Sequence, residues 1–135
     1  MAKTEARPSR PLSPHLTIFR PYVNMMVSIL HRITGSINYA GSLLLAVWLA
    51  AAATGPDSFN LANALFASPP GLVVLFGFSW SLIHHGLGGI RHFMWDMGLG
   101  LTVPAFRFLS WATILGSLLI TGIVWAIGLI KWGAL

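Results

Sequence analysis

Three long apolar stretches constrain the fold of this chain more than any other feature. They cover about residues 27–54, 71–97 and 106–132, separated by a Gly-Pro-Asp turn at 55–57 and by prolines. Each stretch exceeds the roughly 20 residues that an α-helix needs to cross a bilayer. Hydrophobic residues make up 56% of the chain and charged residues only 8%, which does not suit a soluble domain. We therefore expect an all-α integral membrane protein with three transmembrane helices.

The first 26 residues differ from the rest in composition. Four prolines interrupt four basic residues there, which predicts an irregular basic N-terminal arm (1–26) before the membrane domain (27–135). No apolar core follows the early basic residues, and the prolines would spoil an amphipathic presequence helix. We expect a bacterial inner membrane location in preference to the mitochondrial inner membrane. The basic residues of the arm are Lys3, Arg7, Arg10 and Arg20.

The distribution of Lys and Arg predicts the orientation. Arg32, Arg91 and Arg107 join the four basic residues of the arm on one side, which leaves only Lys131 on the other. Because positive residues favour the cytoplasmic side, we expect a cytoplasmic N-terminus. The polar side chains at the edges of the first two spans then lie at the inner edge of the membrane.

Charge and cysteine content exclude several functions. The formal net charge is +5, but the basic residues do not line a soluble face, so we expect no nucleic-acid partner. The chain has no cysteine, and so cannot supply a disulfide, a zinc thiolate or cysteine ligands to an iron–sulfur cluster. A redox centre at this chain would use histidine or belong to a partner.

The edge of the first span carries a polar cluster. Ser28, His31 and Arg32 share one helical face at relative positions zero, three and four. Together they can hydrogen-bond a carbonyl oxygen, as in a quinone, or a carboxylate, as in a haem propionate. Spacing alone supports at least as well an arginine that reaches lipid phosphate, with the other two bonded to the backbone. Thr34 and Gly35 would then serve helix packing.

The second span ends in another cluster. His85 and His92 are seven residues apart, nearly in line on one face, and Gly88 and Gly89 leave a shallow recess beside His85. A porphyrin edge could enter this recess, with His85 on the iron and Arg91 or His92 near the propionates. Close helix packing with an incidental histidine fits the spacing somewhat better.

Distances limit the ligand pairs. Seven helical residues advance about 10.5 Å, whereas two axial nitrogens are about 4 Å apart, so His85 and His92 cannot serve one iron. His84 and His85 point about 100° apart, which disfavours that pair also. A second ligand would come from His31 or, as we favour, from a partner subunit.

The motifs resemble a known family. Residues 10–16 (RPLSPHL), 28–35 (SILHRITG) and 85–96 (HGLGGIRHFMWD) are similar to those of the cytochrome b556 membrane anchors of succinate dehydrogenase, respiratory complex II. The resemblance implies pairing with a second three-helix anchor that shares one haem b, and binding to the flavoprotein and iron–sulfur subunits. It also implies that electrons from succinate pass to ubiquinone, so the whole complex is the enzyme.

By motif position, the resemblance implies a role for several residues. His85 would be the axial haem ligand, with its counterpart on the other anchor; Ser28 and Arg32 would bind quinone; and His31 with Arg32 would lie near the propionates. His84 directly precedes His85, so the choice between them as the ligand depends on the alignment to the family motif. Alignment to residues 89–92 favours His85.

Two other functions are considered. A purely structural anchor would use the glycines for packing and the basic arm for docking, without haem or quinone. A small transporter or channel subunit ranks last, because no paired half-length or broken spans mark a transport site.

Overall fold

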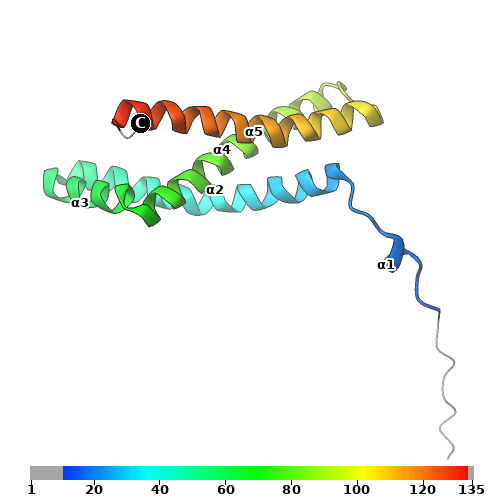
Figure 1. Cartoon of the computed structure of the whole chain (residues 1–135), viewed down its shortest axis with the longest axis horizontal. Coiled ribbons are helices and arrows are strands. Elements are labelled where there is room, and N and C mark those ends of the chain that lie inside the picture. Colours follow the sequence, from blue (N-terminus) through cyan, green and yellow to red (C-terminus); the bar gives the residue numbers. More distant parts are fainter. Residues whose placement is uncertain (1–10, 134–135) are drawn as a thin grey trace, which may run out of the picture.

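A computed structural model of the chain describes residues 11–133, and helices make up most of them (Figure 1). The described part contains no strand. Three of the helices are long and apolar enough to cross a membrane. This confirms the predicted all-α fold with three potential membrane spans. The helices are α1 (His15–Ile18), α2 (Val23–Thr54), α3 (Pro56–Ala67), α4 (Pro69–Asp96) and α5 (Val103–Trp132).

The long helices begin slightly earlier than predicted. Helix α2 begins at Val23 where we expected residue 27, α4 at Pro69 where we expected 71, and α5 at Val103 where we expected 106. Prolines lie in the first turn of α4 and α5, where a missing N–H costs no helical hydrogen bond. In α4 the Ser68 hydroxyl also accepts a hydrogen bond from the Gly71 amide at 3.3 Å. Pro104, which we took as an interruption, therefore lies within α5, while the prolines of α4 lie at a helix start as predicted.

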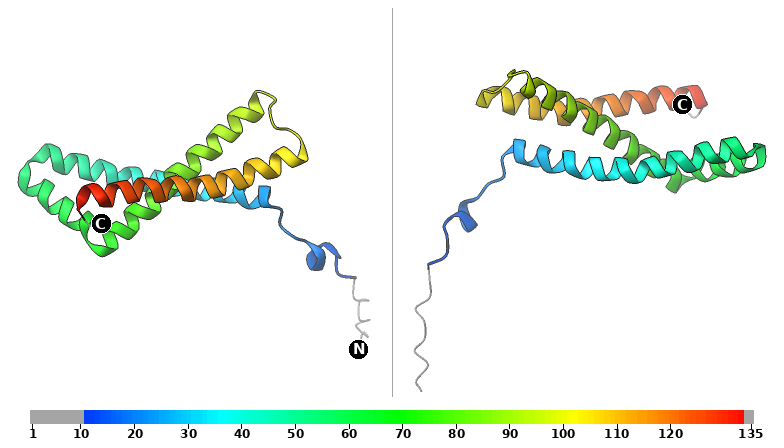
Figure 2. Two further views of the ribbon diagram at one scale, coloured as in Figure 1. Left: turned by 45° about the horizontal axis from the view of Figure 1, so that its top comes forward. Right: turned by 180° about the vertical axis from the view of Figure 1, so that it is seen from behind.

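Helix α3 occupies a region that we expected to be a loop. Gly55 separates α2 from α3 with φ 137°, a backbone conformation that residues with a Cβ rarely adopt. The chain then folds back, so that α3 lies beside the end of α2 (Figures 1 and 2). The Trp48 indole on α2 donates a hydrogen bond to the Asn63 amide oxygen on α3 at 2.9 Å.

The predicted arm is only partly described. Lys3, Arg7 and Arg10 lie outside the described residues. Helix α1 is a single turn that stands away from the long helices (Figures 1 and 2). The last four residues of the predicted arm form the first turn of α2.

The long helices form one bundle in which α4 crosses between α2 and α5 and runs in the opposite direction (Figure 1). The start of α2 and the connection from α4 to α5 lie at one end, which we call the histidine end. Helix α3 and the end of α5 lie at the other, which we call the α3 end. This topology agrees with the predicted grouping of the arm and the second connection on one side.

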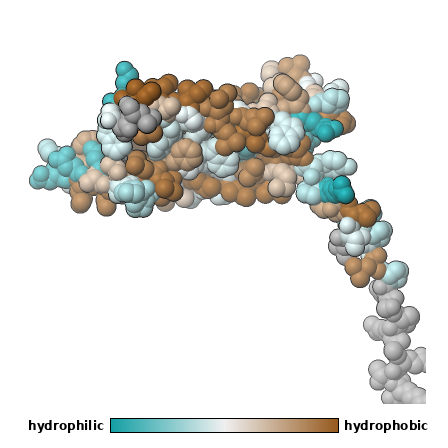
Figure 3. Space-filling model, viewed as in Figure 1, coloured by the Kyte–Doolittle hydropathy of each residue, from teal (hydrophilic) through white to brown (hydrophobic). Residues whose placement is uncertain are grey.

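The interior of this bundle is polar and its exterior is apolar. Among the described residues, only two apolar side chains are buried, those of Val27 and Ala62. Brown, hydrophobic atoms cover most of the visible surface of the long helices (Figure 3). Lipid favours this arrangement, because apolar side chains can face acyl chains while small polar ones pack between helices. The buried polar residues are Thr34, Ser81, His84, Arg91, Ser110, Thr113, Ser117 and Thr121.

Candidate functional site

His85 on α4 packs directly against the backbone of α2. Its Nδ1 lies 3.0 Å from the His31 carbonyl oxygen and 3.4 Å from the Thr34 hydroxyl. Gly35 provides the space, because a Cβ there would lie 3.0 Å from Cε1 of the His85 ring. A carbonyl oxygen can only accept a hydrogen bond. The His85 Nδ1 therefore carries the proton and donates a hydrogen bond to the His31 carbonyl. The lone pair is then on Nε2, the nitrogen that a metal would bind.

The His31 ring stacks on the His85 ring. Their centroids are 4.0 Å apart and their planes differ by 6°. His31 fills a notch at Gly88, where any Cβ would overlap its ring. Nε2 of His31 is buried with no hydrogen-bond partner among the described residues. The recess that we predicted at the two glycines is therefore occupied at Gly88 by an imidazole, whereas a Cβ at Gly89 would meet nothing within 4 Å.

This stack bears on the choice of ligand pair. Two axial imidazoles point ring nitrogens at one iron from opposite sides, whereas these two rings lie face to face. His31 and His85 therefore cannot be the two axial ligands of one iron in this arrangement. If His85 binds iron, we expect a second histidine ligand from another chain.

His92 completes a cluster of three histidines at the α2–α4 interface. Its ring centroid is 5.2 Å from that of His31 and 5.1 Å from that of Trp95, which it meets edge-on. No three metal-binding side chains converge on a common point within residues 11–133. The histidine cluster, His31 with His85 and His92, therefore does not form a three-ligand metal site in the described part of the chain.

Arg91 lies beside this cluster but faces α5. The side chain is 3% exposed, its Nη1 donates to the Ser110 hydroxyl at 3.4 Å, and its guanidinium lies 4.9 Å from the Trp95 ring centre. Nε is buried without a partner in the part of the chain that the structure describes. A buried guanidinium with an unused N–H suits an anionic oxygen.

Ser28 and Arg32 lie on α2 within about one turn of His31. Arg32 is exposed and Ser28 is half-buried. The structure gives neither side chain a hydrogen bond to another described residue, so both are available to an external polar group. Neither side chain hydrogen-bonds to His85 among the described residues, since the polar contacts of that ring are with Thr34 and the His31 carbonyl.

Several polar residues of the interior were not predicted. Thr34 and Gly35, which we assigned to packing alone, also contact His85. The Ser81 hydroxyl lies 3.0 Å from the Thr34 carbonyl and 2.8 Å from the Asn38 amide oxygen.

In α5, hydroxyl residues recur at spacings of three, four and four, a pattern that marks a packing face in an apolar helix. They are Ser110, Thr113, Ser117 and Thr121.

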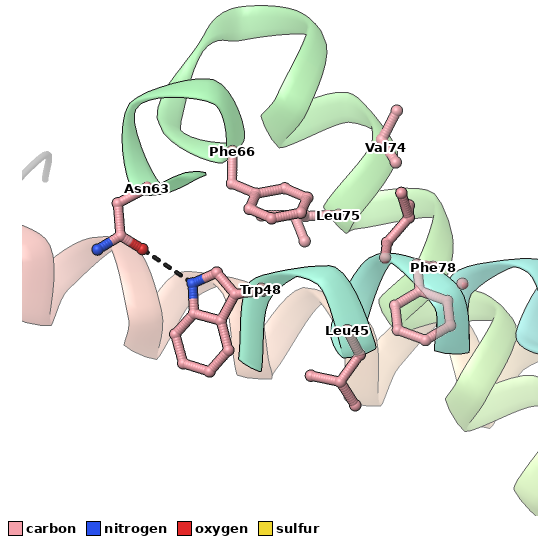
Figure 4. Close-up of a pocket in the computed structure, with 9 residues that line it drawn as sticks. Leu45, Trp48, Asn63, Phe66, Val74, Leu75 and Phe78 are labelled. Atoms are coloured by element: carbon pink, nitrogen blue, oxygen red, sulfur yellow. Dashed lines mark hydrogen bonds between the residues drawn. The ribbon is translucent and has the colours of Figure 1, made fainter. Parts of the chain in front are cut away.

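A cavity of about 270 Å³ lies elsewhere, between α2, α3 and α4 (Figure 4). Leu45, Trp48, Phe66 and Phe78 are among the side chains that line it, and the Trp48–Asn63 hydrogen bond is at its edge. Its lining contains no ionisable group. The cavity lies toward the α3 end, away from the histidine cluster. None of the predicted site residues lines it.

The fold and the site together define a class: an integral membrane protein of three spans, with imidazoles held between two of them. The chain belongs to the succinate dehydrogenase/fumarate reductase transmembrane subunit family, whose sequence model matches residues 6–124. It is thus a membrane subunit of an enzyme complex, as the motifs predicted.

Individual relatives agree with this assignment. A succinate dehydrogenase cytochrome b556 subunit of Paracoccus denitrificans is 40% identical over 114 residues, which are 84% of this chain and 88% of the relative. The protein of the same name from Rickettsia prowazekii is 34% identical over 123 residues, 91% of this chain and 96% of the relative. A mitochondrial cytochrome b560 subunit of Sus scrofa is 40% identical over 101 residues, 71% of this chain and 58% of the relative.

Proposed function

We propose that this chain binds haem b and ubiquinone as a membrane anchor of succinate dehydrogenase, and that it helps to pass electrons from an iron–sulfur subunit to ubiquinone. Its partners are a second membrane anchor, the iron–sulfur subunit and the flavoprotein subunit, which carries the catalytic flavin. The single observation that carries the proposal is the contact of the His85 Nδ1 with the His31 carbonyl.

His85 is the proposed axial ligand of the haem iron. Metal-binding histidines commonly donate their second ring N–H to a backbone carbonyl, which fixes the tautomer and the ring orientation. His85 has this contact at 3.0 Å, and the open space at Gly89 lies on the same helix. These residues therefore fit a haem. A second ligand would come from the other anchor, because the stacked His31 ring does not fit that role.

The propionates would be held by basic and imidazole groups around His85. His31 and Arg91 each keep a buried ring or guanidine nitrogen without a partner in the described part of the chain. Arg32 and His92 are exposed nearby. Anionic carboxylates form strong charge-assisted hydrogen bonds with such groups. When bound, the haem supplies a site that can take or pass on one electron.

Ser28 and Arg32 are proposed to bind the quinone head group. They share one face of α2, and neither has a side-chain hydrogen bond to another described residue. Arg32 donates to a quinone oxygen and favours the negative charge that develops there on reduction, and Ser28 donates a second hydrogen bond. Water reaches this edge of the membrane and delivers the two protons that a quinol needs.

The proposed location is the bacterial inner membrane, with surrounding lipid and a cytoplasmic N-terminus. The bacterial relatives and the three apolar helices support the membrane assignment. The charge asymmetry of the connecting segments supports the orientation.

A purely structural anchor is the second candidate. The notches at Gly35 and Gly88 favour it, because each is filled by an imidazole and thereby joins α2 to α4 without any cofactor.

A reduced-minus-oxidised spectrum of the purified complex separates the two candidates. We expect a b-type haem signal in the natural complex and its loss in His85→Ala, with the subunits still assembled. His84→Asn is the matched control, because it changes the neighbouring histidine and should keep the signal. A signal that survives in His85→Ala would contradict the ligand assignment, and a natural complex without haem would favour the structural anchor.

A further inference from the structure

The buried face of α4 carries a stripe of residues that the proposed mechanism does not use fully. Ser81, His84, Gly88 and Arg91 follow one another at spacings of three, four and three. The three polar members each meet a different point on the neighbouring helices. Ser81 bonds to the Thr34 carbonyl of α2, and Arg91 bonds to Ser110 of α5.

His84 is the most enclosed of these side chains and lies next to the proposed ligand. It is 0% exposed, and its Nδ1 lies 3.1 Å from the Ser117 hydroxyl of α5. The ring lies against Trp80, with centroids 5.2 Å apart. Its Nε2 has no partner among the described residues, so Ser117 is the sole hydrogen-bonding contact that the structure gives this ring.

The positions of His84 and His85 are coupled by helix geometry. Consecutive residues point about 100° apart around the helix axis, so His84 meets α5 while His85 meets α2. A rotation of α4 about its axis would move both rings together. It would also carry the His85 Nδ1 away from the His31 carbonyl.

Packing fixes α4 against α2, because the His85 and His31 rings fill the spaces at Gly35 and Gly88. On the side of α5, by contrast, the buried residues are small hydroxyl residues. Hydrogen bonds between helices have directional requirements that packed small residues lack. Of the hydrogen bonds that join α4 to α5, the His84–Ser117 bond lies closest in sequence to His85.

We propose that His84 is a positioning residue: its hydrogen bond to Ser117 sets the rotation of α4 and thereby the orientation of the His85 imidazole. The inference rests on the proposed role of His85 as an axial haem ligand. His84 itself does not touch the iron.

Four variants of the whole membrane complex test this. Ser117→Ala and His84→Leu remove the bond, whereas His84→Asn keeps it, because an asparagine amide can reach roughly the position of the histidine Nδ1. Ser79→Ala is the matched control, since the Ser79 hydroxyl bonds only to the Leu75 carbonyl of its own helix, at 2.7 Å. The measurements are haem per assembled complex, the EPR g values of the oxidised haem and its midpoint potential.

We expect Ser117→Ala and His84→Leu to retain haem but to shift both the g values and the midpoint potential. His84→Asn and Ser79→Ala should match the natural complex in both. Unchanged g values and potential in Ser117→Ala and His84→Leu would overturn the inference. Loss of the assembled complex in Ser117→Ala would overturn it too, since the hydroxyl would then serve packing in general.

Failure of the proposed function has a different signature. Haem that survives in His85→Ala but disappears in His84→Leu would make His84 the ligand and contradict both proposals. Haem that depends on His85 and is insensitive to Ser117 would leave the proposed function intact and remove only the positioning role.

Discussion

The two ends of the bundle share the long helices, with α3 added at one of them, and they differ in the groups that they bury. At the histidine end, imidazoles, a guanidinium and hydroxyl groups lie between the helices, and several of their nitrogens lack a partner in the described residues. At the α3 end, leucines and aromatic rings line a cavity, with the Trp48–Asn63 hydrogen bond beside it.

This difference shows where chemistry can occur. Polar groups in a membrane are costly when they have no partner, so those at the histidine end support the proposal that a polar or ionic group binds there. An apolar cavity between helices can be filled by acyl chains at little cost. We therefore expect the α3 end to contribute stability and the histidine end to contribute binding.

The largest effect after the loss of haem in His85→Ala is expected for Arg32→Ala. It removes a charged donor to the quinone oxygen, so we expect succinate:quinone reductase activity to fall roughly 100-fold, as for other losses of an oxyanion-stabilising donor. Succinate oxidation with an artificial acceptor at the flavin should not change. Arg107→Ala, an exposed arginine of α5, is the control. Equal loss of both activities would indicate failed assembly and contradict a role in the quinone site.

A smaller effect is expected at the Gly88 notch. Gly88→Ala places a methyl group where the His31 ring lies, and such overpacking costs about 1–3 kcal/mol. We expect a lower midpoint of thermal unfolding and an altered haem spectrum. Gly89→Ala should have neither effect, because its Cβ enters open space. Equal behaviour of the two variants would show that His31 does not occupy the notch.

The smallest effect is expected at the α3 end. Asn63→Ala removes the acceptor of the Trp48 indole N–H, which costs about 1 kcal/mol. Thermal unfolding should begin at a slightly lower temperature, while the haem spectrum and quinone reductase activity stay as in the natural complex. A spectral change in this variant would contradict the separation of the two ends.

The sequence predicted the three membrane spans of the fold but not the short helix α3. Long apolar segments in a bilayer have to be helical, because the backbone has no water to bond with. Helix α3 was missed because residues 55–68 are short and mixed in polarity, so they carry no membrane signal. Its position depends on the reversal at Gly55 and on contacts with α2, which no local pattern encodes.

The candidate site was predictable only within single helices. The seven-residue spacing of His85 and His92 placed both on one face of α4. Both contact His31: the His85 Nδ1 lies near its backbone carbonyl, and the His92 ring lies near its imidazole. That His31 would stack on His85 and fill the Gly88 notch was not predictable, since the register between α2 and α4 depends on how whole helices pack.

The sequence by itself determined three membrane-length helices and which polar residues lie on each helical face, because both follow from local composition and the helical repeat. Tertiary structure alone decided that His85 bonds to the His31 carbonyl while its neighbour His84 bonds to Ser117 of α5. Contacts of this kind depend on the rotation and register of three helices at once, which are set jointly by glycine notches and hydrogen bonds between segments far apart in the chain.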